Sequence, residues 1–222
     1  MSMNLKAKIN KQSWTKYKDS FRYAFYVMTH PFDGFWDLTH EKRGSMAVAN
    51  TLLILTFMTN LWSMRYVNFM FNATRWERVN IWSQVLGILA PLLLYVVANW
   101  CLTTLFDGKG RMKDVYMGMC YSLTPYVLIM NPTTIISNFV TKDEGAFLVY
   151  FEYIALAWCA GLILVSVMQI HDYSLWQAIL ALIFSVAGMM IIVFIIMLFF
   201  SLVSDAVAFF ISLGKEIMYR FY

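Results

Sequence analysis

The chain has 222 residues, of which 60% are hydrophobic, 18% are aromatic and only 14% are charged. A soluble domain of this size cannot bury so much apolar surface in one core, so the composition excludes an ordinary soluble protein. The three cysteines form no CxxC motif and pair with no histidine. We interpret them as small residues buried in a membrane, not as disulfide or metal-binding residues.

Residues 1–44 are predicted to form an N-terminal arm without a cleaved signal peptide, because no long apolar run begins before Ser45. The spacing of aromatic residues within the arm predicts a helix with one apolar face and basic residues off that face. The apolar face holds Trp14, Tyr17, Phe21, Phe25 and Met28, and the basic residues are Lys11, Lys18 and Arg22. This helix is expected either to lie flat on anionic lipids or to pack on the cytoplasmic end of a helix bundle.

Pro31 is predicted to end this helix after His30, and a short second helix is expected from about Phe32 to Arg43. We expect Phe32, Phe35 and Trp36 to face lipid. Asp37, His40 and Glu41 share the polar side of this segment. A solvated helix face explains these three residues better than a metal site, since their spacing lacks a paired-ligand pattern.

Five apolar runs are each long enough to cross a hydrocarbon core about 30 Å thick. They cover 45–64, 84–106, 115–139, 147–169 and 177–203, and Glu152 is their single charged residue. Backbone polar groups in lipid must be satisfied within each segment, which favours helices. The sequence therefore predicts an all-α polytopic bundle, with 45–203 as the transmembrane domain.

The basic residues are unevenly divided between the two sides of such a bundle. The N-terminal arm and the alternate loops carry eleven lysines and arginines, and the opposite side carries six. The positive-inside rule then predicts a cytoplasmic N-terminus and an outer C-terminus, in what we expect to be a bacterial plasma membrane.

The loop at 107–114 is unusually charged and rich in glycine for a connection between two apolar runs. Gly108 and Gly110 are expected to supply backbone conformations with positive φ. Lys109, Arg111 and Lys113 would contact lipid headgroups or an acidic partner, and Asp114 would cap the following helix. A docking site and a plain turn are both compatible with this pattern.

Several polar or helix-breaking residues lie inside the predicted spans. Pro91, Pro125 and Pro132 are expected to kink their helices. Asn99 and Asn131 could line an internal cavity with these prolines, while hydrogen bonding between helices is the expected role of Asn99 and the other scattered polar residues of the spans. Glu152 lies near the outer end of its span, where it could snorkel to the interface.

The last apolar run continues into residues 204–222, which we predict to be an extracytoplasmic arm. A single helix over 177–213 would be about 55 Å long, well beyond the bilayer. We therefore expect a break or bend near Ser204 and Asp205, followed by a second interfacial helix.

No pattern in the chain indicates catalysis. The sequence contains no HExxH, GxSxG or Walker motif, and no Ser/His or Asp/Asp pair lies within the spans. We expect no enzyme activity, no cofactor, no metal and no nucleic-acid partner.

Three segments resemble one known family. They are DGKGRMKDVYMGMCYSLTPYVL at the 107–114 loop, VMQIHDYSLWQAI before the last span, and HPFDGFWDLTHEKRGS before the first. Over roughly residues 30–203 the chain resembles the Yip1 domain family. The resemblance implies five spans with a cytoplasmic N-terminus. Eukaryotic members act in vesicle traffic and bind small Rab GTPases, and they carry a longer acidic and aromatic N-terminal region that is not found here. This chain looks more like the prokaryotic members, for which the family supplies no established activity.

Together these features favour an integral membrane protein that contacts lipids and other integral membrane subunits. The leading hypothesis is an accessory or scaffold subunit of a larger complex such as a transporter. The alternatives are a small-solute transporter or channel in its own right, and a membrane-shaping or trafficking protein of the Yip1 type.

Overall fold

The computed structural model describes residues 2–72, 79–103 and 108–221, without the side chains of residues 2–14, 16 and 221. These ranges contain helices and no strand. The elements are α1 (Ser2–Thr29), α2 (Pro31–His40), α3 (Met46–Tyr66), α4 (Ile81–Thr103), α5 (Met112–Ser122), α6 (Thr124–Ile136), the short 3-10 helix η2 (Lys142–Glu144), α7 (Ala146–His171) and α8 (Leu175–Phe221). The prediction of an all-α protein is confirmed.

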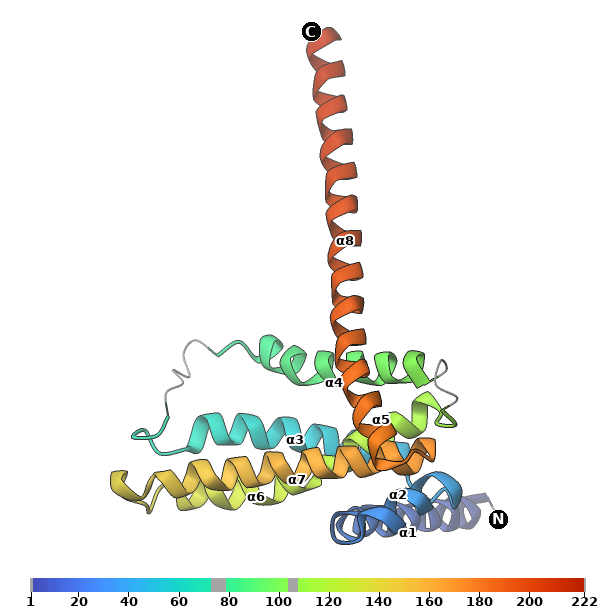
Figure 1. Cartoon of the computed structure of the whole chain (residues 1–222), viewed down its shortest axis with the longest axis vertical. Helices are drawn as coiled ribbons and strands as arrows, with labels where there is room; N and C mark the ends of the chain where they lie inside the picture. The colour runs from blue at the N-terminus through green and yellow to red at the C-terminus, as the bar shows by residue number, and fades with distance from the viewer. Residues whose placement is uncertain (1, 73–78, 104–107, 222) are drawn as a thin grey trace.

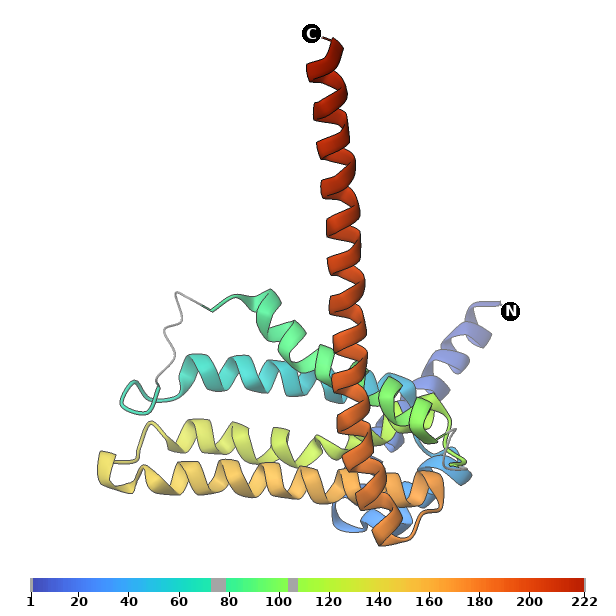
Figure 2. The ribbon, with the colours of Figure 1, turned by 45° about the horizontal axis from the view of Figure 1, so that its top comes forward.

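Four helical segments in the described residues are long and apolar enough to cross a membrane. They are Met46–Tyr66, Ile81–Thr103, Lys142–His171 and Leu175–Arg220. Figures 1 and 2 show α3, α6 and α7 running side by side, with α1 and α2 at one end of the group. The chain is therefore a helical membrane protein built around a bundle of apolar helices.

The predicted span 115–139 is divided between α5 and α6 at Leu123. Pro125 has no N–H to donate to the carbonyl of Tyr121, so one backbone hydrogen bond of a continuous helix is missing. The Thr124 hydroxyl donates to that same carbonyl at 2.7 Å and satisfies it. The division is thus a consequence of one proline, with a threonine hydroxyl replacing the lost amide.

The core lies at the end of the bundle where α1, α2 and α5 meet α3 and α7. Tyr121, Phe35 and Leu38 are among its largest fully buried side chains. Gly34 lets α2 approach α1 closely, because a Cβ at this position would lie 2.9 Å from Cα of Val27. Tight packing of this kind holds the N-terminal arm against the bundle.

The predicted break at Pro31 is confirmed, but the predicted apolar faces on either side of it are partly wrong. Tyr23, Ala24 and Val27 form the buried face of α1, whereas Phe25 is 41% exposed. On α2, Phe32 and Trp36 are exposed as expected, but Phe35 is buried. Both errors arise because α1 and α2 pack on each other and on the bundle, which periodicity alone does not reveal.

Helix α8 is continuous, so the predicted break near Ser204 and Asp205 is wrong. Neither proline nor glycine occurs near these residues, and Ala206 to Ala208 continue the helix readily. With 47 residues, α8 is about 70 Å long. Figure 1 shows it leaving the other helices at a steep angle and ending far from them.

Candidate functional site

The hinge between α4 and α5 carries the predicted charged loop at 107–114. Residue 107 of this loop and residues 104–106 of the predicted span before it lie outside the described residues. The hinge glycines do not have the predicted positive φ, since no described glycine does. They are needed for close approach instead. A Cβ at Gly110 would lie 2.5 Å from Cε1 of His171, and one at Gly108 would lie 2.6 Å from Cβ of Thr103.

His171, at the end of α7, connects the hinge to the interior. The Gly110 N–H donates to Nδ1 of His171 at 3.2 Å, so Nδ1 acts as an acceptor and the ring proton lies on Nε2. Nε2 is 3.0 Å from Oδ1 of Asn99, to which it donates. The Asn99 amide donates to the Ser185 hydroxyl at 3.0 Å, and that hydroxyl donates to the carbonyl of Ala181 at 2.7 Å.

We refer to Gly110, His171, Asn99 and Ser185 as the polar chain. His171, Asn99 and Ser185 are all at least 98% buried. The hydrogen bond from Gly110 requires an unprotonated Nδ1, so the polar chain favours a neutral His171 imidazole. The polar chain joins the hinge, α7, α4 and α8 at one point, which makes it a structural connection.

The outer rim of the hinge is a surface ion pair. Lys109 Nζ lies 3.1 Å from Oδ2 of Asp172. Asp172 ends α7 with a left-handed backbone conformation, φ 56°. Because the Lys109 side chain is 75% exposed, this pair contributes little to stability, and the lysine remains available to a ligand.

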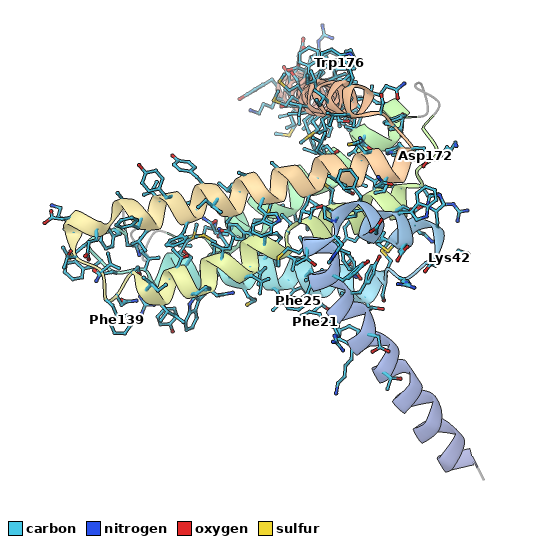
Figure 3. All side chains as sticks on the ribbon, turned by 60° about the horizontal axis from the view of Figure 1, so that its bottom comes forward. Phe21, Phe25, Lys42, Phe139, Asp172 and Trp176 are labelled. Atoms are coloured by element: carbon cyan, nitrogen blue, oxygen red, sulfur yellow. The ribbon has the colours of Figure 1, made fainter. Side chains whose placement is uncertain are left out.

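A cavity of about 370 Å³, which we call the hinge pocket, lies beside this rim. Its lining includes four basic and two acidic side chains: Lys42, Lys109, Arg111, Lys113, Asp114 and Asp172. Figure 3 shows Lys42 and Asp172 at the same end of the bundle, opposite Phe139. The predicted basic residues are thus brought together, and the excess of positive charge suits an anionic group such as a phosphate.

Two details of the hinge pocket were not predicted. Lys42 follows α2 with a left-handed φ of 54° and faces the same cavity as the loop residues; its position in sequence, 67 residues before Lys109, gave no sign of this. Asp114 does not precede α5 as a cap. The helix begins two residues earlier, at Met112, so Asp114 lies in the first turn and interacts with the helix dipole.

The predicted arm residues are not gathered into one site. Phe21 is half-buried, Arg22 is exposed, and Trp36 is exposed with its ring stacked on His40, centroids 3.7 Å apart. The side chain of Trp14 lies outside the described residues. Two of the polar residues predicted on the α2 segment form ion pairs with Arg43, which lies 3.1 Å from Asp37 and 2.8 Å from Glu41.

The predicted residues within the spans also separate. Asn99 bonds to Ser185 of α8 within the polar chain, so the hydrogen bonding between helices predicted for it is found. Asn131 also donates to Thr59 of α3, at 3.0 Å, which was not predicted. Pro125 starts α6, Pro132 lies inside it and is exposed, and Glu152 is exposed on α7. Pro91 lines a second cavity, whose wall takes residues from α3 to α8.

The sequence matches the model of one known family, the Yip1 domain, over residues 25–211. No curated protein and no solved structure matches the chain. A bundle of apolar helices with a charged hinge defines the class as a polytopic membrane protein. The chain belongs to the Yip1 domain family, as its resemblance to that family predicted, and this is a membrane family not known as enzymatic.

Proposed function

We propose that this protein is a non-enzymatic accessory or scaffold subunit of a larger membrane complex, such as a transporter. Its partner would be another integral membrane protein, bound along the free length of α8. The observation that carries the proposal is the state of this helix: from Ile191 to Arg220 every residue is exposed except the half-buried Ile192.

Lipid alone does not cover this surface, because α8 extends about 45 Å from Leu175 to Asp205, past a hydrocarbon core of about 30 Å. Asp205 would lie at the outer edge of the membrane, where a carboxylate can pair with a polar group of a partner protein. Ser201, Ala208 and Ser212 follow the spacing 4, 3, 4 with Asp205 and therefore share its side of the helix. Small and polar residues are typical of contact faces between membrane helices.

The proposed topology has five crossings, with α5 and α6 together forming the third. Residues 112–136 would extend about 37 Å as two helices in line, enough for a hydrocarbon core of about 30 Å. The charge asymmetry supports a cytoplasmic N-terminus and an outer C-terminus in a bacterial plasma membrane. Exposed apolar helices in this arrangement contact lipid.

Site-specific crosslinking tests the contact face. A photoreactive amino acid is placed at Ser201, Ala208 or Ser212 in the tagged full-length chain, crosslinked in native membranes, and the product is identified by mass spectrometry. We expect one protein to be captured from all three positions. Val203, Val207 and Phe210 lie on the other side of α8 and serve as matched controls, from which lipid adducts should dominate.

The role of the charge is tested by substitution. Asp205→Leu should lower the amount of the same partner recovered in mild detergent by roughly tenfold, while Val207→Leu should leave it unchanged, since a lost charged contact costs on the order of 1.5 kcal/mol or more. A chain that purifies alone, or crosslinks equally from both sides of α8, contradicts the proposal. Crosslinks between two tagged copies would show a homo-oligomer in place of a separate subunit.

A further inference from the structure

The cavity beside Pro91, which we call the central cavity, is lined mainly by apolar side chains from α3 to α8. Its volume is about 380 Å³, it opens to the outside of the bundle, and its described lining includes no charged residue. Asn60 of α3 and Tyr95 of α4 contribute polar atoms to its wall. This size and composition fit the usual range of small-molecule pockets, which are mostly apolar with a few polar groups.

Two polar atoms in the wall have no hydrogen-bond partner within the described chain. They are the hydroxyl of Tyr95 and Oδ1 of Asn60, both fully buried at the atomic level. The Tyr95 side chain is more than nine-tenths buried overall. Unsatisfied polar groups in an apolar interior are costly and rare, and each one calls for a partner.

The two neighbouring hydroxyls each take part in a hydrogen bond. The Thr56 hydroxyl donates to the carbonyl of Leu52 at 2.9 Å, and the Asn60 amide nitrogen donates to the Tyr126 hydroxyl at 3.5 Å. The free groups are therefore one phenol, which can donate or accept, and one amide oxygen, which can only accept. A hydroxyl group complements both, because it can donate to Asn60 and accept from Tyr95.

We propose that the central cavity binds a lipid alcohol, an uncharged molecule with an apolar chain and one terminal hydroxyl. The chain would fill the apolar part of the cavity, and the hydroxyl would bond to Asn60 and Tyr95. The lack of charge in the described lining disfavours a phospholipid headgroup or a carboxylate. This site goes beyond the proposed partner contact, which lies on the free part of α8.

Photolabelling tests the proposal. The full-length protein in lipid nanodiscs is labelled with hexadecanol that carries a diazirine in its chain, and labelled residues are mapped by mass spectrometry. We expect labelling of cavity residues such as Ile88 and Met119. Unlabelled hexadecanol should compete. Hexadecyl methyl ether can accept but cannot donate a hydrogen bond, so it should compete about three- to tenfold more weakly, the effect of one net hydrogen bond. Hexadecane can do neither and should compete more weakly still.

Matched variants locate the hydroxyl contact. Tyr95→Phe keeps the shape of the ring and should weaken competition by hexadecanol about three- to tenfold, as loss of one hydrogen bond does. Tyr116→Phe removes a hydroxyl that bonds to Asn50 outside the cavity and should label like the native protein. Ile88→Trp should fill the cavity and abolish labelling of Met119, with thermal unfolding in detergent confirming that each variant folds. Equal competition by hexadecane, or labelling unaffected by both Tyr95→Phe and Ile88→Trp, would overturn the proposal.

Discussion

The amide of Asn99 is bonded at both ends in a fully buried position. Its oxygen accepts from His171 and its nitrogen donates to Ser185. Removing this side chain would leave the buried Nε2–H of His171 without an acceptor, and Ser185 would lose a donor while keeping its bond to the Ala181 carbonyl. Asn50 offers a contrast, since it accepts from the Tyr116 hydroxyl at an exposed position.

We expect Asn99→Ala to lower the free energy of unfolding by about 1–3 kcal/mol, the cost of leaving one buried donor, the Nε2–H of His171, without an acceptor. Asn50→Ala should cost at most about 1 kcal/mol, as its hydrogen bond is exposed. The measurement is reversible unfolding in detergent and denaturant, followed by tryptophan fluorescence. Equal losses for the two variants would show that the polar chain does not stabilise the junction.

The hinge glycines give a second prediction at this scale. A Cβ at Gly110 would lie 2.5 Å from both His171 and Ile170, while one at Gly87 in α4 meets nothing within 4 Å. Gly110→Ala should therefore destabilise the protein by about 1–3 kcal/mol through overpacking. Gly87→Ala should stabilise it by about 0.5–1 kcal/mol, the usual gain from replacing a glycine inside a helix. Opposite shifts in thermal unfolding temperature are expected, and shifts of the same sign would contradict the close approach at the hinge.

At the scale of the element, the α5–α6 junction depends on two adjacent residues. Pro125 removes one backbone donor, and the Thr124 hydroxyl takes its place on the Tyr121 carbonyl. Thr124 and Pro125 are both buried. The two residues should therefore be energetically coupled.

A double-mutant cycle measures this coupling. Thr124→Val should cost about 1–2 kcal/mol in the native background, because a buried carbonyl loses its donor. In a Pro125→Ala background the backbone N–H restored at position 125 can bond to the same carbonyl, so the same substitution should cost much less. Additive effects on the free energy of unfolding would show that the hydroxyl does not replace the proline's missing N–H.

At the scale of the whole molecule, the elements separate into a packed end and a free helix. The core, the polar chain and the hinge pocket all lie where α1, α2 and α5 meet α7, and Figure 2 shows α8 extending away from this end. Within an 18-residue apolar stretch of α8, only 11% is buried against the rest of the protein. An apolar surface of this size must be covered by lipid or by another protein, because its exposure to water is unfavourable.

The proposed five-crossing topology predicts which loops share a side. In a cysteine-free background, we expect single cysteines at Ser13 and Lys113 to react with an impermeant maleimide only after cells are opened. Cysteines at Lys142 and Tyr219 should react in intact cells. Reaction of Lys113 and Lys142 from the same side would contradict a crossing by α5 and α6.

Much of the architecture could be predicted from the local sequence. Long apolar runs require helices in lipid, whatever their neighbours, and proline at position 31 ends a helix wherever it packs. The interhelical role of Asn99 also followed from its chemistry, because a polar side chain in a membrane needs a partner. The positive charge of the hinge could also be predicted, because Lys109, Arg111 and Lys113 are close together in the sequence.

The tertiary structure alone decided the matters that depend on contacts between distant residues. Lys42 joins the hinge pocket, and Gly110 is a glycine because His171 lies against it, not because its φ is positive. The buried face of α1 and the two unpaired atoms of the central cavity are likewise set by neighbouring helices. Hydropathy and propensity act within one segment, so the sequence by itself determined the class of protein and its family, whereas close approach and hydrogen-bond pairing between segments required the assembled fold.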